Sequence, residues 1–172
     1  MHIPDYKYEK NTYSVKLLRT ELEYDIDFVA NRVAKVNFKE DIKTAKNITT
    51  EGRENTDWID DTIMLAMSNL SQRLRFCHIK HSRLSTDETR PQHTPDEGVT
   101  FVMVLNLPEW KGDAETLARL MHSYVVNYVI GEWFDMTVPQ MAEKYTLKAK
   151  DALKHVVQEA RNSDVPTPYS NI

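Results

Sequence analysis

The chain has 172 residues, of which 41% are hydrophobic and 28% charged, and its formal net charge is −4 at pH 7. This length and composition indicate one globular domain with a real core. The mild acidity does not favour a nucleic-acid-binding protein, which is usually basic. A single cysteine, Cys77, excludes an intrachain disulfide, and four glycines are few for phosphate-binding loops or a turn-rich all-β fold. The polar start of the chain and the lack of an apolar run of ~20 residues predict synthesis in the cytoplasm and no contact with a membrane.

The first predicted element is a helix over residues 20–38, which follows an extended N-terminal arm. Thr20 and Glu23 have the spacing of a capping box, in which each side chain bonds a free backbone N–H of the first turn. Apolar residues then recur every three or four positions, which predicts one buried helix face. They are Leu22, Ile26, Val29, Val33 and Val36. Residues 39–55 lack periodicity and predict a loop, with room for a short helical turn.

A second helix is predicted from Asn55 or Thr56 to about His81. Its buried stripe consists of Ile59, Ile63, Ala66, Leu70 and Leu74. Basic residues gather from Arg73 to Arg83, where they suit the negative end of a helix dipole; phosphate contact is the alternative. His78 and His81 lie three positions apart and could begin a metal site. Because zinc needs further ligands, a solvated basic helix end is the favoured interpretation.

Residues 84–98 have the composition of a loop, and residues 100–107 are the best strand candidate. The segment is short and β-branched, and it ends at Pro108. Because a lone strand is unstable, it needs a partner. That partner is either Thr12–Leu18 or a strand of another subunit.

A third helix is predicted over residues 113–135, with Asp113 as its N-cap. Ser123–Phe134 is apolar almost all the way round, which predicts a central helix with Trp133 and Phe134 in the core. β-branched residues keep a strand interpretation open for residues 124–130. A second capping box, formed by Thr137 and Gln140, predicts the start of a fourth helix that ends near residue 161. The short connection between these helices predicts an antiparallel hairpin.

Together these elements predict a mainly α fold. We expect an up-and-down bundle of about four helices with a short β element. The bundle domain covers residues 20–161, between extended arms at residues 1–19 and 162–172.

The sequence contains no pattern typical of an enzyme. Motifs of serine hydrolases, zinc proteases and P-loop proteins are missing, and no histidine follows a glutamate at the spacing that di-iron bundles use. We therefore assign no catalytic, cofactor-binding or metal-binding residue, and we expect the protein not to be an enzyme. The polar residues that an enzyme would use inside the bundle are His122, Asn127, Glu132 and His155. Hydrogen bonding in the core or at an interface is the favoured interpretation for Asn127 and Glu132.

Three segments carry a resemblance to a known family. They are Val99–Pro108, a strand that ends in Leu-Pro; Tyr124–Phe134, the apolar helix; and Ala142–Leu153, in the closing helix. Their order within residues 56–161 resembles the head–tail connector (adaptor or neck) proteins of tailed bacteriophages of the Bacteroides or crAss-like type.

The resemblance implies a virion structural protein without cofactors, made in the host cytoplasm and located at the head–tail interface. Such proteins form rings, typically twelve-fold, between the portal protein and other neck or tail proteins. Genomic DNA passes through the ring without sequence-specific binding. Terminal arms of such subunits order when they grip a neighbour.

Two other interpretations remain open. The first is a small helical regulatory or inhibitor protein that binds a host protein, and the second is a helical-bundle enzyme. A regulator would be monomeric or dimeric and absent from virions, whereas a connector would be a ring within them.

Overall fold

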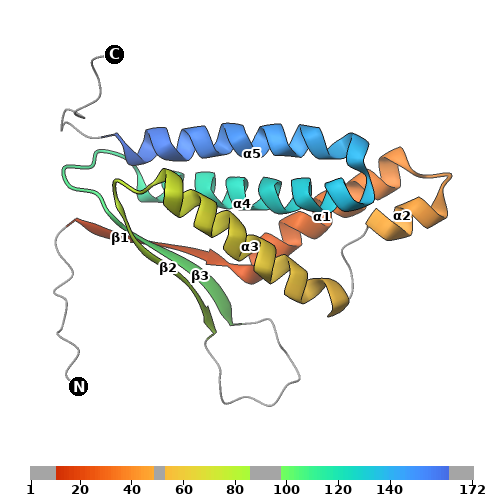
Figure 1. Ribbon diagram of the computed structural model, residues 1–172, viewed down its shortest axis with the longest axis horizontal. Helices are drawn as coiled ribbons and strands as arrows, with labels where there is room; N and C mark the ends of the chain where they lie inside the picture. The colour runs from red at the N-terminus through yellow and green to blue at the C-terminus, as the bar shows by residue number, and fades with distance from the viewer. Residues whose placement is uncertain (1–10, 49–52, 86–97, 163–172) are drawn as a thin grey trace.

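The computed structural model describes residues 11–48, 53–85 and 98–162. Within these ranges, four long helices and one short helix pack on a three-stranded antiparallel sheet (Figure 1). The prediction of a mainly α bundle with a short β element is confirmed. Of the expected arms, residues 1–10 and 163–172 lie outside the described residues.

The sheet has the strand order β1-β3-β2 and is built from β1 (Thr12–Leu18), β2 (His78–Ser85) and β3 (Val99–Asn106). β1 pairs antiparallel with β3 along its whole length, from Thr12 opposite Asn106 to Leu18 opposite Thr100. The predicted strand therefore finds its partner within the same chain, and part of the region expected to be an N-terminal arm is an edge strand of the sheet.

The second predicted helix is wrong at its C-terminal end. α3 (Arg53–Arg73) ends well before His81, and the chain turns and returns as β2, which pairs antiparallel with β3 and has a bulge between His78 and Lys80. His78 and His81 therefore lie on a strand, and the basic run does not form a helix end. The predicted stripe from Ile59 to Leu74 is nevertheless buried throughout.

α1 (Arg19–Asn37) begins directly where β1 ends, with Leu18 at the N-cap and no side-chain capping bond. The predicted capping box of Thr20 and Glu23 is therefore wrong. Leu22, Ile26 and Val33 are buried as predicted, but Val36 is 64% exposed. A short helix, α2 (Ile42–Ile48), follows within the region predicted as a loop with a helical turn.

α4 (Ala114–Thr137) and α5 (Pro139–Ala160) form the predicted antiparallel hairpin, joined by Val138 alone, and they make the most extensive contact between any two elements. The strand interpretation of residues 124–130 is excluded. Asp113 is the N-cap of α4, as predicted, and accepts a hydrogen bond from the Thr116 N–H at 2.7 Å. The second capping box is wrong, because the Thr137 hydroxyl donates to the Trp133 carbonyl, one turn earlier in α4.

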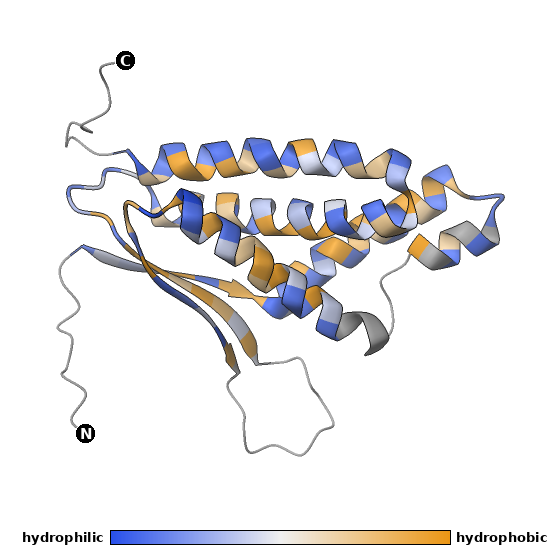
Figure 2. Ribbon diagram, in the orientation of Figure 1, coloured by the Kyte–Doolittle hydropathy of each residue, from blue (hydrophilic) through white to orange (hydrophobic). Residues whose placement is uncertain are grey.

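α4 is the central helix, since it contacts α1, α2, α3, α5 and β1. Trp133 is 8% exposed and its indole N–H donates to the Ile48 carbonyl at 2.7 Å, which fastens α2 to the core. Figure 2 shows the contrast between the hydrophobic strand β3 and α5, along which hydrophobic and hydrophilic residues alternate. Within the described ranges, no helix has the length and apolar character needed to cross a bilayer.

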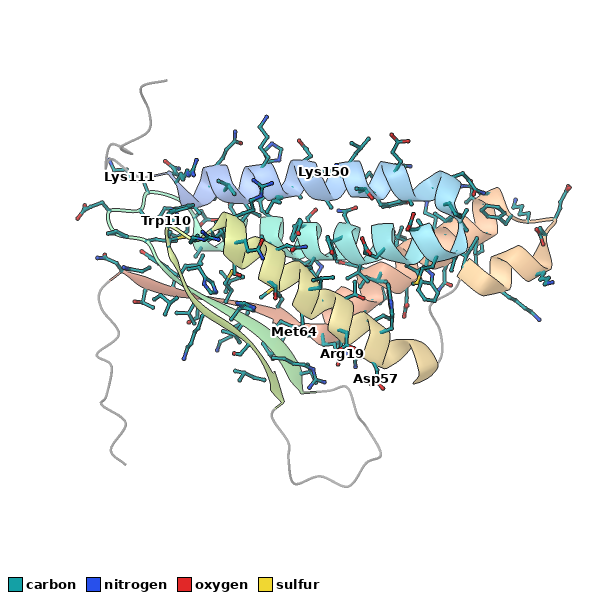
Figure 3. The ribbon with its side chains drawn as sticks, in the orientation of Figure 1. Arg19, Asp57, Met64, Trp110, Lys111 and Lys150 are labelled. Atoms are coloured by element: carbon teal, nitrogen blue, oxygen red, sulfur yellow. The ribbon has the colours of Figure 1, made fainter. Side chains whose placement is uncertain are left out.

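The connection between β3 and α4 holds the C-terminal end of α5 in place. Trp110, labelled in Figure 3, donates its indole N–H to the Glu159 carbonyl at 2.8 Å. The backbone N–H of Lys111 donates to the Asn162 carbonyl at 2.8 Å. α5 is thus fixed to the rest of the fold at both ends.

Candidate interaction surfaces

A buried ionic cluster joins α1, α3 and β2. The Asp60 carboxylate accepts from Arg19 Nε at 2.5 Å and from Arg83 Nη2 at 2.8 Å. The Arg19 side chain is fully buried and lies against α3 (Figure 3), whereas that of Arg83 is 40% exposed. A carboxylate held between two guanidinium groups accepts charge-assisted hydrogen bonds from both, so the cluster is suited to fixing the fold.

Two histidines continue this polar layer between α3 and β2. His78 Nε2 lies 3.0 Å from His81 Nδ1, and His81 Nε2 lies 3.3 Å from the Ser68 hydroxyl. Burial, and secondarily the charge of His81, lower the pKa of His78. Among the described residues, His, Cys, Asp and Glu side chains form no group of three that could hold a metal ion.

Cys77 precedes this layer and is buried. Burial raises the pKa of its thiol to about 12. The thiolate is the reactive form of cysteine, so Cys77 is not suited to nucleophilic chemistry at neutral pH.

An open groove of about 580 Å³ lies between α1, α4 and α5, and we name it the α1–α4–α5 groove. α4 forms its floor with Ser123, Val126 and Asn127, and α1 and α5 form its walls. The wall residues are Phe28, Val29, Arg32, Val33, Val36 and Asn37 from α1, and Met141, Lys144, Tyr145 and Lys148 from α5. At one end the Asn37 amide lies 3.7 Å from the Met141 sulfur, which brings the two walls together.

Positive charge predominates in the groove. Arg32, Lys144 and Lys148 are exposed along it, and both lysine ammonium groups lie over the Tyr145 ring, at 5.7 and 5.1 Å from its centroid. Burial raises the pKa of the Tyr145 hydroxyl, and the charge of Arg32 opposes that rise. The groove is thus a cationic surface around a neutral aromatic ring.

Asp25 and His122 divide the groove from a second hollow of about 620 Å³. His122 Nε2 lies 2.7 Å from the Asp25 carboxylate, and both residues line both hollows. The second hollow runs toward β1 and includes Lys16, Leu17 and Tyr24.

An apolar stripe on α1 borders these hollows. Tyr24 is 69% exposed, Phe28 55% and Val36 64%, and the rings of Tyr24 and Phe28 stack with centroids 6.5 Å apart. These residues lie four and eight positions apart, so they share one helix face, with Arg32 between them. The sequence contains a signal for this exposed face, because α1 has more apolar residues than a single buried helix face can hold.

The residues singled out from the sequence are only partly brought together. His122 and Asn127 both line the α1–α4–α5 groove. Glu132 and His155 are exposed outside it, where His155 lies 3.8 Å from Asp151. Trp133 and Phe134 lie in the core, as predicted.

Sequence reasoning did not find the groove itself or the ionic cluster, because both are assembled from helices and strands far apart in the chain. Comparison with known protein families, with curated proteins and with solved structures found no match.

Proposed function

We propose that this chain is a structural subunit of a tailed-bacteriophage virion, a head–tail connector that forms a ring between portal and tail. The observation that carries the proposal is the exposed apolar stripe of Tyr24, Phe28 and Val36. Large apolar side chains gathered on one exposed helix face are typical of a surface that another protein covers. In a ring, the neighbouring subunit is that protein.

The three segments that resemble connector proteins support this proposal by their placement. Val99–Pro108 contains β3, Tyr124–Phe134 lies in the C-terminal half of α4 and is mostly buried, and Ala142–Leu153 lies in α5, which packs on α4. Two of the three segments therefore belong mainly to the core of the fold, and the third is an amphipathic helix segment with one buried face.

The sheet offers a further surface for contact between subunits. β1 and β2 are both edge strands within the described ranges, and Leu18 and Leu84, 44% and 51% exposed, both lie opposite Thr100. These three residues form one row on the same face of the sheet, because residues directly opposite in paired strands point to the same side. Exposed edges and apolar rows of this kind pair readily with another chain.

In the ring, duplex DNA passes through the channel with weak, sequence-independent contacts. The net charge of −4 supports this part of the proposal, since a protein that neutralises many phosphates would hold the DNA tightly. Strongly salt-dependent binding of the assembled protein to duplex DNA would contradict it.

Density-gradient fractionation of the native source, with mass spectrometry of this chain in every fraction, tests the proposal. We expect the chain to co-migrate with DNA-filled particles at about a dozen copies per particle, as a ring subunit would. Its presence only outside particles, as a monomer or dimer, would refute the connector function and favour the regulatory protein that binds a host partner.

A further inference from the structure

We propose that the α1–α4–α5 groove binds the acidic segment of residues 86–97 from a second copy of the chain. The proposal rests on the proposed function, because it names the contact through which ring subunits join. It is argued from the charge of the groove, from the sequence of the segment and from the place of each in the fold.

Cationic side chains outnumber acidic ones in the lining of the groove. Arg32, Lys144 and Lys148 are exposed in it, and the one acidic residue among the lining residues, Asp25, is engaged with His122. This concentration occurs on a chain whose net charge is −4. Such a groove attracts an acidic segment and not a basic one.

The remaining lining suits an extended peptide. Ser123 and Asn127 on the floor offer hydroxyl and amide groups, and the half-exposed side chain of Phe28 offers apolar contact at the rim. Mixed polar and apolar walls on either side of an open channel are typical of peptide-binding grooves.

The segment of residues 86–97, Thr-Asp-Glu-Thr-Arg-Pro-Gln-His-Thr-Pro-Asp-Glu, has the complementary charge. It contains four acidic residues and one arginine, so its formal net charge is 1 − 4 = −3. Pro91 and Pro95 favour an extended backbone in the residues that precede them.

The second copy follows from the proposed function, in which neighbouring subunits of a ring contact one another. Ser85 and Val99, which lie on either side of the segment in the sequence, are paired in the sheet, and the ends of β2 and β3 from which the chain leaves lie on the side of the molecule opposite α5 (Figure 1). The groove and the segment are different parts of the chain, so a contact between them in two copies joins subunits head to tail, which closes into a ring when the rotation allows.

The first experiment measures binding of a synthetic peptide of residues 85–98 to the full chain by isothermal titration calorimetry. We expect the peptide to bind the wild type, less tightly at high salt. The double substitution Lys144→Glu and Lys148→Glu should weaken binding about tenfold or more. The matched control is Lys150→Glu with Lys154→Glu, which changes the same charge at the same spacing on α5 outside the groove.

The second experiment uses sedimentation velocity. Two variants should each be monomeric. The groove variant carries Lys144→Glu and Lys148→Glu. The segment variant carries Asp87→Asn, Glu88→Gln, Asp96→Asn and Glu97→Gln. Mixed together, they should form a one-to-one heterodimer and nothing larger, because one intact groove meets one intact segment.

The outcomes separate the two proposals. Suppose that the wild type forms rings, and that the groove variant also forms rings and binds the peptide as tightly as the control does. This result would overturn the contact and leave the ring function standing. A wild type that associates through the groove but is absent from virions in the gradient fractions would overturn the ring function and leave the contact standing, whereas a monomeric wild type would overturn the contact. Failure of the peptide to bind the wild type at millimolar concentration would overturn the groove contact.

Discussion

Replacing Asp60 by Asn should destabilise the protein far more than replacing Arg83 by Gln. Asp60 bonds both arginines, but only Arg19 is fully buried. Loss of the carboxylate removes the closest counter-charge of the buried Arg19 guanidinium, which costs about 3–5 kcal/mol of unfolding free energy. The side chain of Arg83 is 40% exposed, so its loss costs about 0–1 kcal/mol.

Urea unfolding followed by far-ultraviolet circular dichroism measures both free energies. For a chain of this length, the Asp60→Asn cost corresponds to a fall of roughly 10 °C in Tm. Arg19→Met combined with Asp60→Leu serves as a control, because apolar replacement of a whole buried pair recovers most of the loss. If Asp60→Asn and Arg83→Gln differ by less than about 1 kcal/mol, the buried charge of Arg19 does not set the cost of losing Asp60, and the reasoning is refuted.

Three further predictions concern the core and the polar layer. Trp133→Phe, which loses the bond to the Ile48 carbonyl, should cost about 1 kcal/mol, and Trp133→Ala about 3–5 kcal/mol, in the same urea assay; an unchanged midpoint for Trp133→Ala would contradict its core position. The pKa of His78 is lowered from its ordinary value of 6.5, so the unfolded state binds more protons below that pH. The free energy of unfolding should therefore fall as pH decreases from 7.5 to 5, and His78→Gln should flatten that fall; equal slopes would count against the lowered pKa of His78 as its source. Because burial raises the pKa of Cys77 to about 12, the native protein should not react with Ellman's reagent at pH 8, whereas the urea-unfolded chain should react at once.

The α4–α5 hairpin could be predicted from the sequence because its signals are local. Apolar spacing, the Asp113 N-cap and the short connection each depend on residues within one or two helical turns. The central position of α4 also followed from one local feature, the apolar character of Ser123–Phe134 on nearly every face. Such signals need no knowledge of the partner elements.

The capping boxes failed for a physical reason that the sequence does not carry. Helix α1 begins at Arg19 because β1 runs directly into it, so Leu18 occupies the N-cap before Thr20 can. Thr137 still belongs to α4, and its hydroxyl bonds back to the Trp133 carbonyl. In both places the preceding element of the fold decides where the helix begins, and local capping preference is overridden.

β2 was mistaken for the end of a helix because its burial pattern is the reverse of a usual strand. His81 and Arg83 lie opposite Met103 and Phe101, whose side chains are fully buried, so these polar residues face the helices. Leu84, one position on, is 51% exposed. A pattern that turns polar residues inward gives no strand signal when read from the sequence alone.

This reversed pattern assigns a role to the ionic cluster. If β2 slipped by one residue along β3, every side chain would change face: Leu84 would turn toward the helices and Arg83 toward solvent. Burial of Leu84 would favour that slip, although Lys80 and Ser82 would turn inward with it. The bond from Arg83 to Asp60, together with the charge of buried Arg19 that Asp60 must balance, opposes it, because the slipped register leaves Asp60 with one fewer guanidinium. The register that the cluster selects is also the one that keeps Leu18 and Leu84 exposed in one row beside Thr100. The same contacts that fix the strand thus maintain the apolar face that the proposed assembly would cover.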